Sequence, residues 1–290
     1  MTDLITAPTR AKAPRRRPVG PRRNNVWIHL VLSIGAVVMM FPFVWQILMS
    51  LSTNAEVQSV TPHLWPEKIQ WGNYAEVFRQ LPFLDQLRTS VVITVIRVLG
   101  QIAFCTLAGY AFARMHFRGK NLVLGAVLSI LMVPSQVYLL PQYQIIKDLG
   151  LLGTMTGLLL PGLFSAFGTF LMRTAFLALP SELEEAARLD GANPFQVFWH
   201  VMLPLIRPSI SVLAITSTLW SWNELLWPLV VTTNSDDMPL SAGLATLIND
   251  RTVNYPIVLA ASLLATAPVL ILFIVLQRRV IDGLATSGLK

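Results

Sequence analysis

The sequence predicts an all-α integral membrane protein with six transmembrane helices and both ends in the cytoplasm. Its mean hydropathy is +0.59, and 54% of its 290 residues are hydrophobic while only 13% are charged. Soluble domains carry about 25% charged residues, so lipid is expected to surround most of this chain. Six stretches are also apolar over about 20 residues, the length that crosses the hydrocarbon core of a bilayer.

The first 25 residues differ from the rest of the chain. They mix seven Arg and Lys residues with prolines, and such a composition cannot build a packed core. We therefore expect a disordered basic cytoplasmic arm over residues 1–25 and a transmembrane domain over residues 26–290. The apolar stretch after the arm is too long for the core of a signal peptide, so it is expected to stay as an anchor.

The sequence contains six predicted spans. They cover about residues 26–51, 89–113, 122–145, 151–172, 208–231 and 255–276. Only Lys147 and Asp148 separate the third span from the fourth. Pro134, Pro141, Pro161 and Pro228 lie within or at the ends of spans, where proline kinks a helix by removing a hydrogen bond.

The basic residues indicate the orientation of the spans. With both ends inside, 16 of the 22 Arg and Lys residues lie on the cytoplasmic side, five lie outside and Arg97 lies in a span. Cytoplasmic segments of membrane proteins carry this excess of positive charge. The net charge of +7 is therefore assigned to topology in the cell membrane, and no nucleic-acid partner is expected.

Two external segments, residues 52–88 and 232–254, are long enough to have a role of their own. The first contains Trp65, Trp71 and Tyr74, which suit a structure at the membrane interface. The second is polar. Contact with an external partner and a solvated connector are both open for each segment.

A cytoplasmic helix-turn-helix is predicted over residues 181–203, between the fourth and fifth spans. Ser181 and Glu184 have the spacing of a capping box, which would start the first helix. Gly191 is expected to end that helix, since glycine adopts positive φ at low cost. Asn193 would cap a second helix that has Pro194 at its first position.

The two helices are expected to present different surfaces, one apolar and one lined by small residues. Phe195, Phe198 and Met202 recur at helical spacing and are expected to form one apolar face. Small residues of the first helix and the turn leave a surface that another protein can approach closely. From the pattern alone, packing of both helices against the membrane interface is an equal alternative.

This segment resembles the EAA motif of ABC importer permeases. The matching residues are Glu185-Ala186-Ala187, Asp190-Gly191-Ala192, Phe198, Leu203-Pro204 and Pro208. In that family the motif forms helices that dock into a groove of the ATPase subunit. The resemblance thus implies the ABC type I importer permease fold with a cytoplasmic coupling helix. It assigns ATPase coupling to Leu183, Glu184, Glu185, Ala186, Ala187, Asp190, Gly191, Ala192, Phe198 and Pro204.

Three further segments resemble the same family, and the last of them narrows the class. They are Ala108–Arg114, Ser221–Glu224 and the ending Gln277–Lys290. The ending is similar to that of carbohydrate-uptake permeases, specifically the smaller, second permease of the pair, as in the maltose transporter. It implies a tail whose Gln277, Arg278 and Gly283 contact the ATPase subunits. Ala285 departs from the family, where Thr is common.

The resemblance implies several partners. They are a second permease in a heterodimer, a dimer of ATPase subunits that bind ATP and Mg²⁺, an external solute-binding protein and a sugar-like solute. No ATP site is expected in this chain, because Gly119-Lys120 lacks the earlier glycine and the following Ser or Thr of a P-loop.

Catalytic, metal and cofactor sites are likewise not expected in this chain. Its four histidines, at positions 29, 63, 116 and 200, are scattered without the spacing of metal ligands. No Ser/His/Asp grouping can be argued either.

Two charges within spans need an explanation, because a charge at membrane depth faces protein or a water-filled cavity. The functional interpretation is a substrate path lined by Trp220, Trp222, Asn223 and Glu224, whose aromatic faces and hydrogen-bonding groups suit a sugar. The structural interpretation is that Arg97 and Glu224 hold helices together. For Arg97 we prefer the structural role, and for the fifth-span group both stay open.

The sequence therefore predicts a permease subunit of an importer for sugars or sugar-like solutes. A permease for glycerol-3-phosphate or a polyol is the alternative, although Arg97 alone offers little for a phosphate. A secondary transporter would leave the cytoplasmic helix pair without a role. A membrane-embedded enzyme or an assembly protein would have still less support.

Overall fold

The backbone of the computed structural model is described for residues 26–61, 64–248 and 253–287. The side chains of residue 273 and of residues 275–287 lie outside that description, as does the predicted basic arm over residues 1–25. Every element within the described ranges is helical. The chain divides into two units, residues 1–45 and residues 46–290.

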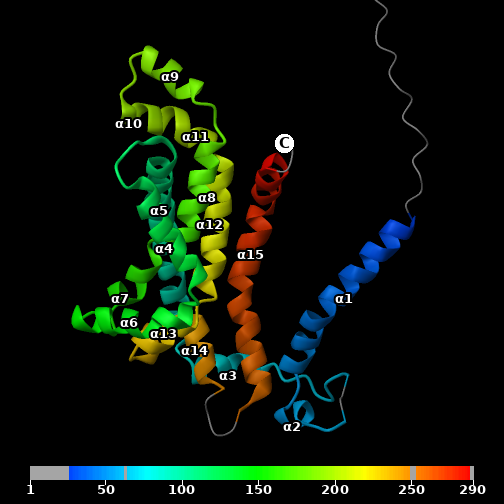
Figure 1. The fold of residues 1–290 in the computed structure, drawn as a ribbon. Coiled ribbons are helices and arrows are strands. Elements are labelled where there is room, and N and C mark those ends of the chain that lie inside the picture. The colour runs from blue at the N-terminus through cyan, green and yellow to red at the C-terminus, as the bar shows by residue number, and fades with distance from the viewer. Residues whose placement is uncertain (1–25, 62–63, 249–252, 288–290) are drawn as a thin grey trace, which may run out of the picture. The chain divides into compact units, whose positions relative to one another are not determined.

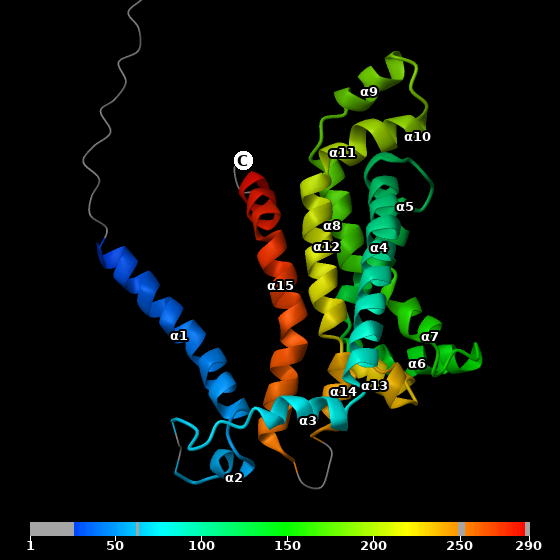
Figure 2. The ribbon, with the colours of Figure 1, turned by 180° about the vertical axis from the view of Figure 1, so that it is seen from behind.

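The first unit contains most of α1 (Val26–Ser50), which agrees closely with the predicted first span. The second unit is built on four helices that run side by side (Figures 1 and 2). They are α4 (Phe83–Arg114), α8 (Ala166–Leu177), α12 (Arg207–Trp222) and α15 (Tyr255–Ser287). Helix α4 packs against α8 and α12, and α12 also packs against α15.

Among the described residues, three helices are long and apolar enough to cross a membrane: α1, α4 and α15. Three bent helix pairs raise this to six if each pair is one span. The predicted all-helical fold with up to six spans is therefore confirmed, while three of the spans are broken rather than straight.

The predicted third span is the most strongly bent. Helix α5 (Lys120–Ser129) and the 3-10 helix Ile130–Met132 make an angle of 111° with α6 (Ser135–Asp148). The break falls at Val133, which is extended, and Pro134, which has non-helical dihedral angles. Proline disfavours a helical conformation in the residue before it, so the span predicted over 122–145 is broken at this point, where the sequence has Pro134.

The fourth and fifth spans are also divided. In the fourth, α7 (Met155–Leu159) and the 3-10 helix Leu160–Gly162 precede α8 at an angle of 41°. In the fifth, α12 ends at Trp222 and α13 (Leu226–Val231) begins after three intervening residues. The helix expected over 208–231 is therefore interrupted at Asn223, Glu224 and Leu225.

The two segments predicted to be external contain short helices rather than open loops. The first holds α2 (Asn54–Val57) and α3 (Gly72–Gln80), and α3 packs on α15. The second holds the 3-10 helix Ser235–Asp237 and α14 (Leu240–Thr246). The buried Gln86 side chain of α4 donates to the Ser235 carbonyl at 3.1 Å, and Ser90 Oγ accepts from the Leu240 amide at 2.7 Å. The described part of this second segment is thus fastened to α4.

Candidate functional site

The predicted helix-turn-helix lies at the end of α8 and α12 that is opposite to α14 (Figure 1). We call it the coupling element. It consists of α9 (Glu182–Leu189), α10 (Pro194–Gln196), a π-helix over Val197–Met202 and α11 (Leu203–Leu205). The segment Pro194–Leu205 meets α12 at 74°.

The turn between the two helices forms as the residues predict. Gly191 has φ +87°, a conformation that L side chains rarely adopt, so α9 ends there. Asn193 then caps α10 reciprocally with Gln196: each side chain accepts from the other's amide at 2.9 Å. Pro194 occupies the first position of α10, where its missing N–H costs no helical hydrogen bond.

The start of the first helix differs from the expected capping box. Ser181 has helical dihedral angles and makes no side-chain cap. Glu184 instead lies 3.3 Å from Arg114 Nε of α4 and 3.5 Å from Arg188. The contact with Arg114 brings opposite charges together without hydrogen-bond geometry, since both of these atoms lack a hydrogen-bond partner. A carboxylate that is only 9% exposed is stabilised by opposite charge, so the capping box is wrong.

The second helix buries a different face from the one expected. Phe198 and Met202 are buried in a cluster with Met172 and Phe176, whereas Phe195 is 68% exposed. Phe195 stacks instead on the exposed Trp199, at a centroid distance of 6.1 Å. The π-helix has more residues per turn than an α-helix, which changes the side-chain spacing; the face expected to include Phe195 is therefore wrong.

The residues assigned to ATPase coupling fall into three groups in the structure. Phe198 and Glu184 are buried, and Ala187, Ala192 and Pro204 are half-buried. Leu183, Glu185, Ala186, Asp190 and Gly191 are exposed. A partner can reach only the exposed and half-buried members directly, and their contact with an ATPase stays a prediction.

The tail residues assigned to the same partner lie in the last part of α15. Its helical backbone continues through Gln277, Arg278 and Gly283 to Ser287. Their side chains lie outside the described residues, so their contact with the ATPase also stays a prediction.

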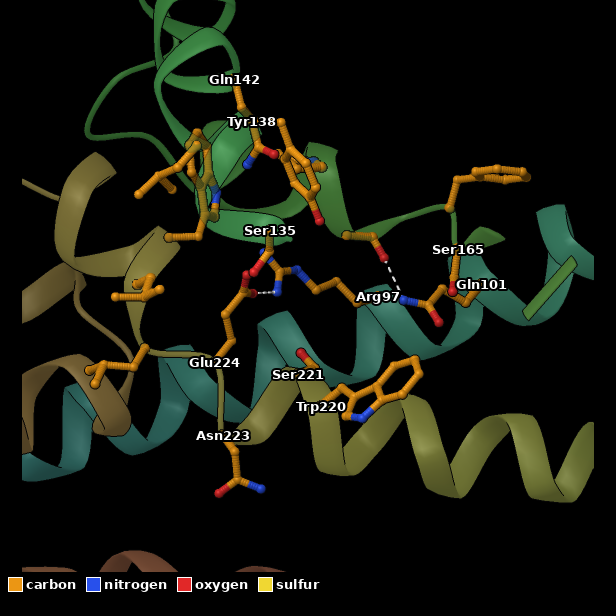
Figure 3. Close-up of a pocket in the computed structure, with 17 residues that line it drawn as sticks. Arg97, Gln101, Ser135, Tyr138, Gln142, Ser165, Trp220, Ser221, Asn223 and Glu224 are labelled. Atoms are coloured by element: carbon orange, nitrogen blue, oxygen red, sulfur yellow. Dashed lines mark hydrogen bonds and ion pairs between the residues drawn. The ribbon is translucent and has the colours of Figure 1, made fainter. Parts of the chain in front are cut away.

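A cavity of about 770 Å³ lies between α4, α6, the turn before α8 and the break after α12 (Figure 3). Its polar lining comes from amide, hydroxyl and charged side chains: Arg97, Gln101, Ser135, Gln142, Ser165, Ser221, Asn223 and Glu224. Its aromatic lining comes from Tyr138, Phe164, Trp220 and Trp227.

Three of the four residues assigned to the substrate path line this cavity. These are Trp220, Asn223 and Glu224, although the Asn223 side chain points away from Arg97 (Figure 3). Trp222 does not line it, because two residues along a helix turn a side chain to the opposite side. Its Nε1 donates to the Ala265 carbonyl of α15 at 3.2 Å, beside a separate cavity of about 340 Å³.

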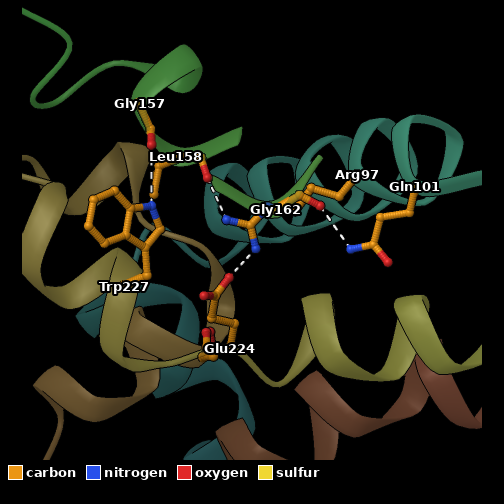
Figure 4. Close-up of polar contacts among 8 residues, drawn as sticks. Arg97, Gln101, Gly157, Leu158, Gly162, Glu224 and Trp227 are labelled. Carbon is orange, nitrogen blue, oxygen red and sulfur yellow. Dashed lines mark hydrogen bonds and ion pairs between the residues drawn. The ribbon is translucent and has the colours of Figure 1, made fainter. Parts of the chain in front are cut away.

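Arg97 both holds helices together and lines the cavity (Figure 4). Its guanidinium forms an ion pair with Glu224 and donates to the carbonyl of Leu158 at the end of α7. The Arg97 side chain is 5% exposed and that of Glu224 is 34% exposed, so the pair presents mainly its carboxylate to the cavity. A Cβ on Gly162 would lie 2.7 Å from Arg97 Cδ, so this close approach requires glycine.

Other lining residues were not singled out from the sequence. Gln101 donates to the Gly162 carbonyl at 2.8 Å and accepts from Ser217 Oγ at 2.6 Å. It lies four residues after Arg97, so it shares a helix face with that charge, and this spacing was the available signal. Tyr138 and Gln142 of α6 carried no comparable signal, because the bend that brings them to the cavity was not predicted.

This helical membrane chain has an element of paired helices at one end and an open cavity with a polar and aromatic lining. Such an architecture is that of a membrane transport subunit. The model of the family "Binding-protein-dependent transport system inner membrane component" matches residues 105–284. The chain therefore belongs to this family. It is a multi-pass inner-membrane permease of an ABC importer, and the ATPase that drives transport is a separate subunit.

Similar proteins cover almost the whole chain. The arabinooligosaccharides transport system permease protein AraQ of Halalkalibacterium halodurans is 36% identical over 276 residues, which are 93% of this chain and 99% of that protein. The sn-glycerol-3-phosphate transport system permease protein UgpE of Pectobacterium atrosepticum is 31% identical, over 92% of this chain and 98% of its own.

A solved structure shares the fold. A chain in the crystal structure of a bacterial ABC transporter involved in the import of the acidic polysaccharide alginate aligns with a TM-score of 0.76 and 26% identity. The alignment covers 90% of this chain and 99% of that chain. The predicted family and the predicted separation of permease from ATPase are thus confirmed.

Proposed function

We propose that this permease imports a neutral oligosaccharide. The observation that carries the proposal is the lining of the 770 Å³ cavity, where aromatic rings stand beside uncharged amides and hydroxyls. A sugar ring offers apolar C–H faces to aromatic rings and hydroxyl groups to polar side chains. A few placed polar groups within a largely apolar wall are typical of small-molecule sites.

The charge of the cavity favours a neutral solute over a phosphorylated one. Arg97 is the cation among the described lining residues, and Glu224 neutralises it. A phosphate group would need a cation that is free to bind it. Of the two activities named for the similar permeases, arabinooligosaccharide transport therefore fits this cavity better than sn-glycerol-3-phosphate transport.

The length of the hollow region favours more than one sugar ring. A second cavity of about 590 Å³ adjoins the first and shares six lining residues with it. The shared wall includes the aromatic side chains of Tyr138, Phe164 and Trp220, together with Gln142 and Ser165. This wall offers ring faces and hydrogen-bonding groups to consecutive sugar units.

The proposal extends to the complex in which this permease works. We place that element and both termini in the cytoplasm, in keeping with the basic residues on that side. There it docks on an ATPase dimer, with a second permease as the heterodimer partner and an external binding protein that delivers the solute. Closure of the ATPase dimer moves the coupling element and alternates access to the cavity.

The test begins with affinity purification of the tagged chain from its native membrane in mild detergent, followed by mass spectrometry. An ATPase with a P-loop, a second permease and a binding protein are expected to co-purify. The complex is then reconstituted in liposomes, and ATP-dependent uptake of arabinotriose is compared with that of glycerol-3-phosphate. Uptake of glycerol-3-phosphate alone would overturn the neutral-sugar proposal. Recovery of the chain without any ATPase would favour a secondary transporter instead.

A further inference from the structure

Helix α4 meets the coupling element at Phe198, which packs on Tyr110 at a ring-centroid distance of 5.0 Å, and at the buried side chain of Glu184 in α9. The structure describes all eight residues of α9, and within this helix Glu184 is the buried residue. Leu183 and Leu189, its two large apolar side chains, are 38% and 88% exposed. Apart from the half-buried Ala187, which packs against the cluster of Met172, Phe176 and Phe198, apolar side chains therefore contribute little to holding α9 in place.

The polar contact between α9 and α4 is an ion pair. Glu184 Oε1 lies 3.3 Å from Arg114 Nε, and the two side chains are 9% and 13% exposed. The same guanidinium donates through Nη2 to the carbonyl of Phe176 at 2.7 Å and to that of Leu179. Phe176 lies in the last turn of α8 and Leu179 lies two residues beyond it, in the region where the carbonyls of a helix end accept hydrogen bonds from side chains. Arg114 thus connects the last turn of α4, the end of α8 and the start of α9.

Helix α4 carries this connection to the cavity. It is continuous from Phe83 to Arg114, and its residues Arg97 and Gln101 line the cavity. The 17 residues from Arg97 to Arg114 correspond to about 25 Å along a helix axis. A displacement of Glu184 that is passed to Arg114 therefore acts on the helix that positions the Arg97–Glu224 ion pair.

We infer that the Arg114–Glu184 contact is the link through which movement of α9 reaches α4, which makes Arg114 a positioning residue for transport. The inference rests on the proposed function, in which the ATPase moves the coupling element. Glu184 acts in it as an internal anchor of α9, whereas the exposed residues of α9 that are assigned to coupling, Leu183, Glu185 and Ala186, meet the partner. Loss of the link separates ATP hydrolysis from uptake and leaves the complex assembled.

The test uses the complete complex with its ATPase and binding protein, reconstituted in liposomes. Glu184→Gln keeps the shape of the side chain and removes its charge. Its matched control is Glu182→Gln, because Glu182 is an exposed residue in the first turn of the same helix. The readouts are solute uptake, the ratio of ATPase activity with and without binding protein, and the amount of ATPase that co-purifies.

The expected result is a fall of about tenfold or more in uptake and in the stimulation ratio for Glu184→Gln. The control is expected to behave as the wild type, and both variants should retain their ATPase subunits. Uptake by Glu184→Gln equal to that of the control would overturn the inference. Loss of the ATPase from the Glu184→Gln complex would also overturn it, because Glu184 would then hold the partner rather than α4.

A double-mutant cycle tests the link itself. If Arg114 and Glu184 act as one unit, Arg114→Gln combined with Glu184→Gln should lower uptake no further than the more severe single variant. Effects that multiply would show independent roles and contradict the link. If Glu184→Gln fails to insert in the membrane, Glu184→Asp takes its place. This variant keeps the carboxylate but holds it one methylene farther from Arg114. We expect it to retain part of the ATPase stimulation, and full stimulation would contradict the link. A wild-type complex without an ATPase would instead overturn the proposed function.

Discussion

Arg97 and Glu224 form an ion pair across 127 positions of the sequence, joining the middle of α4 to the break between α12 and α13. Arg97 also binds the Leu158 carbonyl at the end of α7. One buried cation thus connects three segments of the chain, and its carboxylate partner forms part of the cavity wall. The pair therefore contributes to stability and to the charge balance that a solute would meet.

Removal of one member of this pair should cost more stability than removal of both. Glu224→Ala leaves the buried Arg97 without its carboxylate, and breaking a buried pair costs about 3–5 kcal/mol. We expect the lower end of that range, because the Glu224 side chain is 34% exposed. Arg97→Gln combined with Glu224→Gln should recover part of the loss. Thermal unfolding of the purified variants measures this, and strictly additive losses would argue against the pairing.

Gly162 should be required for the position of Arg97. The Cβ of Gly162→Ala would come within 2.7 Å of Arg97 Cδ, so the guanidinium would have to move away from Leu158 and Glu224. We expect lower thermal stability and lower uptake than in the wild type. Gly125→Ala is the matched control, since a Cβ at that position in α5 meets no atom within 4 Å. Equal stability of the two variants would refute the proposed packing.

The exposed aromatic pair of the coupling element should contribute to ATPase binding. Phe195 and Trp199 are 68% and 53% exposed and stack on each other. Exposed apolar residues that cluster mark interaction surfaces, and truncation of a hot-spot aromatic at an interface costs about 2 kcal/mol or more. Phe195→Ala with Trp199→Ala should therefore reduce the ATPase that co-purifies. Leu122→Ala, at a residue of α5 that is 78% exposed, is the control and should retain it.

The effect of a substitution at Gly191 should depend on how readily the new residue adopts positive φ. Its φ of +87° strains most residues although the surrounding space is open, and such strain costs about 1–3 kcal/mol. Gly191→Arg should insert in the membrane but hydrolyse ATP without matching uptake. Gly191→Asn should be milder, because asparagine is enriched at positive φ. The ratio of uptake to hydrolysis measures both, and normal uptake by Gly191→Arg would disprove the role of this turn.

The coupling element shows how far local sequence reasoning extends. The turn at Gly191 and the cap at Asn193 were predicted correctly, because both depend on the conformational preferences of a few adjacent residues. The capping box at Ser181 and the face containing Phe195 were wrong. In the first case Arg114, 70 positions away, attracts the Glu184 side chain; in the second a π-helix changes the side-chain spacing.

The sequence by itself determined that the chain is a helical membrane protein and where its apolar stretches lie, because hydrocarbon selects for composition over about 20 consecutive residues. Its motifs also carried the family resemblance. Only the tertiary structure decided that Arg97 meets Glu224, that α6 turns by 111° to bring Tyr138 to the cavity, and that Trp222 faces α15. These relationships depend on which residues that are distant in the sequence come into contact in the fold. Hydropathy and local spacing do not indicate those contacts.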